Sequence, residues 1–160
     1  MSKHEGIPVP PVAMVAAGVV QRFMPKGKKC RRLRRVASVA LIAASGALLV
    51  STFASFARHG TTVDPTVPAS ASILVTGGTN AITRNPMYAA MAGVLLAHAV
   101  DRGSWRALLP VAGFVVVVDR LQIVREEQAL RSLFGEAYLQ YCARTPRWIG
   151  RRTLDFFKGY

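Results

Sequence analysis

A run of 22 uncharged residues, from position 36 to position 57, constrains the fold of this chain more than any other feature. As an α-helix this run would be about 33 Å long, enough to cross the hydrocarbon core of a bilayer. Alanines four residues apart within it, such as Ala40 and Ala44, have the spacing that lets a neighbouring helix pack closely. We therefore predict a transmembrane helix over residues 36–57.

The overall composition supports a membrane protein whose charges lie outside the bilayer. Of the 160 residues 51% are hydrophobic, yet 21 basic and 8 acidic residues give a formal charge of +13. Basic residues of membrane proteins gather in loops and tails, where they meet anionic lipid headgroups. A nucleic-acid-binding protein can be equally basic but does not need a long uncharged run. We therefore expect membrane lipids, and no nucleic acid, as partners.

Metal and disulfide chemistry have little support in the sequence. The two cysteines, Cys30 and Cys142, are far apart and form no CxxC pair, so neither a disulfide framework nor a cysteine zinc site is implied. His98 has no second ligand at metal-binding spacing and is interpreted as an interfacial or hydrogen-bonded histidine. We expect no metal site.

Further apolar segments predict an all-α, polytopic membrane helix bundle of about four transmembrane helices. A short first helix is expected at about 8–24, and a dense basic loop, 25–35, separates it from the main apolar run. Apolar residues at about 86–101 and 104–124, on either side of a turn, predict a helical hairpin. We divide the chain into N-terminal membrane helices, residues 1–57, and a second half, residues 58–160.

The segment after the hairpin is expected to leave the membrane. Its first part has the pattern of an amphipathic helix, which Gly135 should end or kink. Aromatic residues follow, of the kind that favour the membrane interface. We therefore predict a C-terminal interfacial helical segment on the cytosolic side.

The sequence Arg84-Asn85-Pro86-Met87-Tyr88 lies where a polar connection meets the first arm of the hairpin. A proline suits the first turn of a helix, so Pro86 should begin this arm and leave its polar neighbours at the mouth of the helix. On these residues alone, a capped membrane helix with an interfacial arginine and tyrosine is the simpler explanation.

Two of the eight acidic residues, Glu126 and Glu127, are adjacent and follow a membrane helix directly. Ionisable residues at the edge of a bundle are costly unless paired, which makes this pair a functional candidate. The structural alternative is that both pair with Arg120, Arg125 or Arg131 of the same helix. Spacing alone does not separate the two explanations.

Five motifs follow one another in the second half of the chain. They are Gly60-Thr61-Thr62-Val63-Asp64-Pro65, Arg84-Asn85-Pro86-Met87-Tyr88, Glu126-Glu127-x-x-Leu130, Phe134-Gly135-x-x-Tyr138-x-x-Tyr141 and Pro146-Arg147-Trp148-Ile149. In this order, around a helical hairpin, they resemble the isoprenylcysteine carboxyl methyltransferase and phospholipid methyltransferase superfamily. The resemblance covers roughly residues 60–150, while the first two helices match only as apolar segments.

The resemblance implies an integral, multi-pass membrane methyltransferase that depends on S-adenosylmethionine, with residues 58–160 as the cofactor-binding half. The acceptor would be a lipid or small lipophilic molecule that enters from the bilayer and carries a carboxylate, amine or thiol. Because the cofactor is made in the cytosol, its pocket should face the cytosol. The basic loop 25–35 then lies outside, against the positive-inside rule.

The resemblance also implies which residues form the cofactor pocket. One wall is Arg84, Asn85, Pro86 and Tyr88, the facing wall is Glu126 and Glu127, and a cytosolic lid is Tyr138, Tyr141 and Arg147. The catalytic candidates are Glu127, Tyr88 and Glu126. Glu127 can bind the ammonium of the cofactor, while the π-face of Tyr88 can attract its sulfonium. With an amine acceptor, Glu127 or Glu126 could remove a proton.

One stretch departs from the pattern of the superfamily. Thr79, Asn80 and Ala81 follow the Gly77-Gly78 pair, where members usually carry a proline, an aromatic residue and an arginine. The missing arginine would remove a contact to the cofactor or to a headgroup. The alternative function is therefore a non-catalytic membrane scaffold or assembly protein that retains the methyltransferase fold.

Overall fold

The computed structural model of this protein describes residues 9–27, 30–58, 73–150 and 153. The motif at 60–65 lies outside the described residues. A 3₁₀ turn, Trp105–Ala107, precedes the fifth helix, and a π-helical turn, Asp119–Ile123, joins the fifth helix to the sixth. The helices are α1 (Val9–Phe23), α2 (Arg31–Arg58), α3 (Thr79–Ile82), α4 (Pro86–Arg102), α5 (Leu108–Val118) and α6 (Val124–Arg144).

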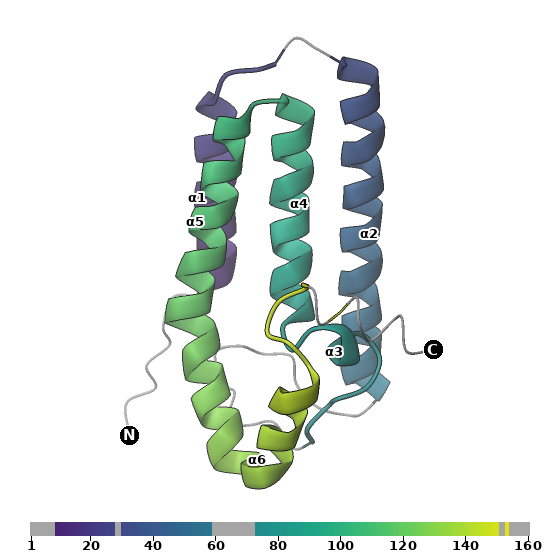
Figure 1. Ribbon diagram of the computed structural model, residues 1–160, viewed down its shortest axis with the longest axis vertical. Coiled ribbons are helices and arrows are strands. Elements are labelled where there is room, and N and C mark those ends of the chain that lie inside the picture. The colour runs from purple at the N-terminus through teal and green to yellow at the C-terminus, as the bar shows by residue number, and fades with distance from the viewer. Residues whose placement is uncertain (1–8, 28–29, 59–72, 151–152, 154–160) are drawn as a thin grey trace.

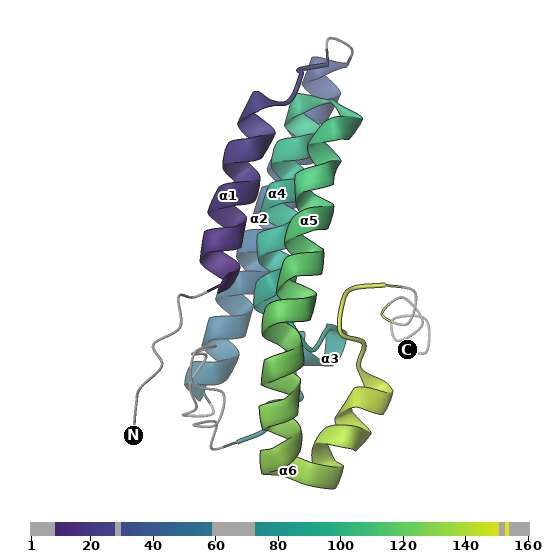
Figure 2. The same ribbon diagram turned by 90° about the vertical axis from the view of Figure 1, so that its left-hand side faces the viewer.

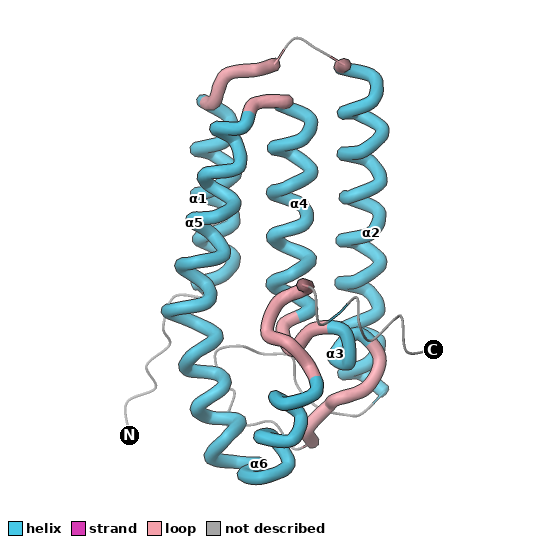
Figure 3. The backbone as a smooth tube through the Cα atoms, in the orientation of Figure 1, coloured by secondary structure: helices cyan, strands magenta, loops and turns pink. Residues whose placement is uncertain are grey.

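Along the long axis of the molecule lie, side by side, the helices α1, α2, α4 and α5, and the described residues contain no strand (Figures 1 and 3). The predicted all-α membrane bundle is thereby confirmed. Two continuous helices, Arg31–Arg58 and Trp105–Arg144, are long and apolar enough to cross a membrane, and α1 is a shorter apolar helix. The expected hairpin is formed by α4 and the start of the second of these long helices.

Helix α4 occupies the centre of the bundle and contacts α1, α2 and α5 (Figure 1). Buried residues of α4 form an apolar core with side chains from α1, from α5 and from the π-helical turn. Side chains pointing away from the core are largely apolar and exposed, as expected where a helix faces lipid tails. The buried core cluster is Ala17, Tyr88, Leu95, Phe114, Val118 and Ile123.

Helix α2 packs on α4 through small polar residues. Ser38, Ser45 and Thr52, seven residues apart, are buried, and a side chain at Gly93 of α4 would collide with Ser45. The Thr52 hydroxyl is satisfied within its own helix, donating to the carbonyl of Leu48 at 2.7 Å. Small hydroxyl residues can thus line a close interface in an apolar environment.

The alanine spacing seen in the sequence does not form this interface. Ala40 and Ala44 are exposed, on a different face of α2 from the buried serines. The prediction that these alanines receive the neighbouring helix was therefore wrong for the contact with α4. Serine is nearly as small as alanine, so the spacing of small residues alone does not identify the packed face.

The described residues between α1 and α2, 24–27 and 30, lie at the end of the bundle where α4 turns into α5 (Figure 1). Gly103 ends α4 in the left-handed conformation, with φ of 63°. Against this turn, the guanidinium of Arg34 donates to the carbonyls of Gly27, at 2.8 Å, and Arg102, at 3.3 Å. Arg102 in turn donates to the carbonyl of Met24. Part of the basic segment therefore holds the bundle together, and α2 begins five residues before the uncharged run.

A buried amide ties α1 to the hairpin. The side chain of Gln21 is fully buried, and its Nε2 donates to the carbonyls of Leu95 and Ala107, both at 2.9 Å. Its Oε1 lies 2.9 Å from Nδ1 of His98. His98 is therefore a hydrogen-bonded histidine, as its isolated position in the sequence suggested.

Candidate functional site

The polar residues of the second half meet at the end of the bundle opposite the basic segment. A sharp bend in α6 makes this possible, because Gly135 has φ of 50° and ψ of −123°, outside the helical region. Figure 2 shows the last turns of α6 returning towards α3 and the start of α4. The predicted kink at Gly135 is confirmed.

Residues 83–85 and 145–147 lie against each other in the space that the bend creates. The backbone N–H of Arg84 donates to the carbonyl of Pro146 at 2.9 Å. The hydroxyl of Thr83 and the side-chain amide of Asn85 both donate to the carbonyl of Arg147, at 2.8 and 3.1 Å. Helix α4 begins at Pro86, whose missing N–H would have had no partner within the helix.

Glu127 is held by two guanidinium groups from these two segments. Its Oε1 accepts hydrogen bonds from Nη2 of Arg84, at 2.7 Å, and Nε of Arg147, at 3.0 Å. Its Oε2 accepts one from Nη2 of Arg147 at 2.5 Å. Such a forked arrangement fixes both charge and orientation. Both carboxylate oxygens of Glu127 are therefore engaged by cations of the protein itself.

Asp119 extends this ionic network to the π-helical turn. Both of its oxygens lie 3.1 Å from Nη1 of Arg147, and its Oδ1 accepts a hydrogen bond from the indole of Trp148 at 2.9 Å. Arg84 also reaches the end of α6, donating to the carbonyls of Thr145, at 2.7 Å, and Cys142, at 3.2 Å. A cation at these carbonyls complements the negative end of the helix.

The two arginines stay charged in this setting. The hydrogen bonds from Arg147 to Glu127 raise the pKa of its guanidinium, against the opposing effect of burial. Burial alone would lower the pKa of Arg84, but its hydrogen bond and ion pair with Glu127 leave that pKa above the usual arginine value.

Glu126 lies in different surroundings from its neighbour. Its Oε1 accepts hydrogen bonds from the hydroxyl of Tyr88, at 2.5 Å, and from Nε2 of Gln122, at 2.8 Å. Both donors are uncharged, and none of the ion pairs among the described residues includes Glu126. The π-helical turn just before α6, a feature often found at functional sites, sets the direction in which both glutamates point.

The aromatic residues of the returning part of α6 are buried. Tyr138 and Tyr141 pack edge to face with their rings 6.2 Å apart, and the Tyr141 hydroxyl donates to the backbone carbonyl of Asn80 at 2.7 Å. Thr79 adds a contact to α2, its hydroxyl lying 3.1 Å from that of Thr52. The two tyrosines of the predicted cytosolic lid are thus buried, and Tyr141 packs against α3.

Two buried polar atoms at this end of the bundle have no protein partner. They are the side-chain oxygen of Asn80 and Nε of Arg84. The amide nitrogen of Asn80 donates to the carbonyl of Val75 at 2.8 Å, which fixes the direction of the oxygen. Buried polar atoms without partners are rare, and Arg34 and Arg102 at the basic end each have one as well.

The structure brings most of the predicted site residues into one connected cluster. Arg84, Glu127 and Arg147 form the ionic network, Tyr88 donates a hydrogen bond to Glu126 beside it, and Asn85 joins the two backbone segments. Sequence reasoning missed Asp119 and assigned no role to Asn80. Asp119 is the acidic residue that ends an apolar run, a signal that could have found it, whereas Asn80 carried none.

No group of three His, Cys, Asp or Glu side chains within the described ranges is placed to hold a metal ion. In comparisons with known proteins, the model of a family described as phospholipid methyltransferase matches residues 33–137. An uncharacterized protein of Haemophilus influenzae is 38% identical over 63 residues, which are 39% of this chain and all of that protein. No solved structure matches. The family match includes Arg84 to Tyr88, Asp119 and both glutamates.

Proposed function

This chain belongs to the phospholipid methyltransferase family, and we propose that it is an S-adenosylmethionine-dependent methyltransferase of the membrane. Its acceptor in this proposal is a lipid or small lipophilic molecule with a carboxylate, amine or thiol. The matched region covers about two thirds of the chain and contains the apolar helices α4 and α5 together with Arg84, Asp119 and both glutamates of the polar cluster.

The observation that carries this proposal is the environment of Glu126. S-adenosylmethionine has two cationic groups, a sulfonium and an ammonium, and a site for it needs negative charge that the protein has not already neutralised. Glu127 shares its oxygens with two guanidinium groups, while Glu126 accepts hydrogen bonds from the neutral Tyr88 and Gln122. Glu126 is therefore the better cation-binding carboxylate, whereas the sequence favoured Glu127.

The unpartnered atoms at the same end of the bundle can also bind polar groups of this cofactor. The side-chain oxygen of Asn80 can accept a hydrogen bond from an ammonium, amine or hydroxyl group, and Nε of Arg84 can donate one to a carboxylate. When bound, the cofactor supplies a methyl group on a positively charged sulfur. Asn80 thus offers a polar contact at the stretch where the usual arginine of the superfamily is missing.

The other residues of the cluster have positioning roles in this proposal. Arg147 and Arg84 hold the end of α6 against the start of α4 through Glu127. Tyr88 fixes the direction of Glu126 with its hydroxyl, and its ring can offer a π-face to a cation. Methyl transfer needs mainly alignment of donor and acceptor, so a rigid frame is sufficient. With an amine acceptor, Glu126 could also take the proton.

The proposed site faces the cytosol, where the cofactor is made. In this orientation the basic end of the bundle, with the turn at Gly103, lies on the opposite side of the membrane. The acceptor enters sideways from the bilayer, because the bundle exposes apolar side chains to it along its length.

The direct test measures binding of labelled S-adenosylmethionine to purified protein, followed by label transfer to a membrane lipid extract. Glu126→Gln keeps the shape of the side chain and its hydrogen bonds but removes the charge. We expect this variant to unfold at an unchanged temperature and to bind the cofactor at least about tenfold more weakly, the effect of losing one charge-assisted contact. Glu136→Gln, at an exposed position on the same helix, is the matched control.

The same experiment decides the alternative function. Absence of both cofactor binding and label transfer would refute the enzyme and favour a non-catalytic membrane scaffold or assembly protein. Thr79 and Asn80 give that alternative its structural support, since both make contacts within the protein. Cofactor binding without label transfer would support the cofactor site and show that no lipid of the extract is the acceptor.

A further inference from the structure

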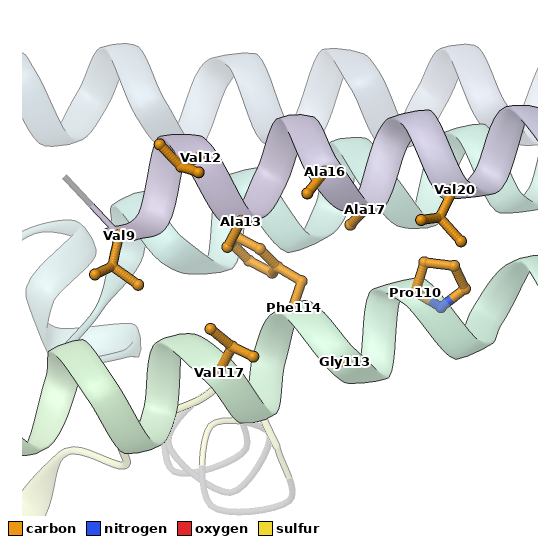
Figure 4. A pocket seen from close by; sticks show the side chains of 10 residues that line it. All are labelled: Val9, Val12, Ala13, Ala16, Ala17, Val20, Pro110, Gly113, Phe114 and Val117. Atoms are coloured by element: carbon orange, nitrogen blue, oxygen red, sulfur yellow. The ribbon is translucent and has the colours of Figure 1, made fainter. Parts of the chain in front are cut away.

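A long apolar groove runs between α1 and α5 on the outside of the bundle (Figure 4). Its volume is about 490 Å³, within the range typical of ligand pockets. Every residue that lines it is apolar or glycine, and Val12 on its rim is half exposed. The groove therefore opens sideways, towards the lipid tails that surround a membrane helix.

Small residues create the groove. On α1, alanines at 13, 16 and 17 face it, and on α5 the position opposite is Gly113. A methyl group placed on Gly113 would meet no atom within 4 Å, so the space above this glycine is open. Larger side chains at these positions would let α1 and α5 close the gap, as helices in contact normally do.

One end of the groove lies near the candidate site. Phe114 lines it and also belongs to the buried core cluster that contains Tyr88, the partner of Glu126. Trp148, which donates to Asp119, packs against the same cluster. On the same helix as Phe114, Val117 lines the groove two residues before Asp119. One end of the groove thus adjoins the polar cluster, and the rest extends along the apolar part of the bundle.

We propose that this groove binds the hydrocarbon chain of the lipid acceptor and so holds the acceptor with its polar end at the site. The inference rests on the proposed function and adds the place where the acceptor is recognised. A hydrocarbon chain fits because the lining offers no hydrogen-bonding side chain and because one end of the groove lies next to the turn that begins at Asp119, where a headgroup would meet the polar cluster. Packing against a second copy of this chain would not require this position next to the polar cluster.

The test uses photolabelling in detergent, where lipid is limited. Purified protein is exposed to a phosphatidylethanolamine that carries a diazirine in one acyl chain, with and without excess unlabelled phosphatidylethanolamine, and the labelled peptides are identified. We expect labelling that competes away in α1 and α5. Gly113→Leu should fill the groove and weaken the competed labelling about tenfold, the factor for displacing about two methylene groups.

Gly46→Leu is the matched control, because Gly46 is an exposed glycine of α2 with equally open space above it. Equal labelling of α2 and the groove helices, labelling that excess lipid does not reduce, or an unchanged result with Gly113→Leu would overturn the proposal. A dimer of the natural protein that Gly113→Leu converts to a monomer would also overturn it, in favour of a second copy in the groove.

The labelling and the cofactor assay separate this inference from the proposed function. Competed labelling of the groove in a protein that binds no S-adenosylmethionine would refute the enzyme and support the groove as a lipid-chain site. Cofactor binding with labelling spread evenly over the bundle would support the enzyme and refute the groove.

Discussion

Two adjacent carboxylates acquire different electrostatic surroundings because successive residues of a helix project about 100° apart. Glu127 points towards the arginines of residues 84 and 147, and Glu126 points towards Tyr88 on α4. The sequence could identify the pair as unusual, but it could not say which glutamate forms no ion pair with the described residues. That distinction depends on the rotation of α6 about its axis, which no local pattern encodes.

Replacement of Tyr88 by phenylalanine isolates the hydrogen bond to Glu126. The ring stays in the core cluster, so the unfolding temperature should change little. We expect cofactor binding to weaken about tenfold, because a hydrogen bond to a charged group contributes about 1.5–3 kcal/mol. Equilibrium binding of labelled S-adenosylmethionine measures the effect. Unchanged affinity would show that the Tyr88 hydroxyl has no part in the site.

Replacement of Arg147 by lysine tests the forked contact between α6 and the segment that follows it. Lysine keeps the charge but cannot bridge Glu127 and Asp119 with a planar fork. We expect a loss of about 1–3 kcal/mol in stability, towards the lower end because Arg147 is partly exposed. Arg144→Lys, at an exposed position nearby, is the control in thermal unfolding. If the two variants unfold at the same temperature, the forked contact of Arg147 does not stabilise the protein.

At the scale of helices, the two irregular turns of the long helix position the site. The π-helical turn at 119–123 sets the rotation of α6, and the bend at Gly135 returns its second half to the bundle. The bend was predictable, because glycine is the residue that tolerates a left-handed conformation. The π-helical turn was not, since it follows from packing against neighbouring helices and leaves no mark in the order of residues.

Replacement of Gly135 by alanine should disturb the bend. At φ of 50° a side chain is strained, which costs about 1–3 kcal/mol. The returning helix would be displaced, so Tyr141 would lose its contact with Asn80 and cofactor binding would fall with stability. Thermal unfolding and binding assays measure both effects. Gly46→Ala, in the regular part of α2, should be neutral or stabilising; equal effects of the two changes would refute the strain.

The helices themselves could be predicted with fair accuracy because apolar runs mark the parts of a chain that enter the bilayer. Hydropathy does not mark where a helix begins, which is why α2 starts at Arg31 rather than at Val36. The assignment of residues to the cofactor pocket and the division of the chain at residue 58 stay predictions. Both came from the resemblance to a superfamily, and geometry alone does not identify a bound ligand.

At the scale of the whole molecule, the bundle has two chemically different ends. One is basic and held by the carbonyl contacts of Arg34 and Arg102, and the other carries the carboxylate cluster. Helix α1 lies before the region that the family match covers, yet Gln21 fastens it to α4 and to the turn before α5. The first helix is therefore an integrated part of the bundle.

The two cysteines allow the orientation to be measured without disturbing either end. Cys30 is exposed at the basic end, so in the Cys142→Ser variant it is the single thiol of the chain. With the site in the cytosol, a membrane-impermeant maleimide should label it in intact cells. A Glu136→Cys thiol in a Cys30→Ser, Cys142→Ser background should react only after permeabilisation. The reverse pattern would refute the proposed orientation.

The separation of the two ends also has an electrical consequence. In the proposed orientation the basic end is carried to the outer face of a membrane whose inner face is negative. Each positive charge that crosses does work against the potential, about 2.3 kcal/mol per 100 mV. The membrane potential, negative inside, therefore opposes insertion of this molecule in the proposed orientation. Dissipating the potential should increase the fraction of chains that reach the orientation in which the carboxylate cluster meets its cofactor.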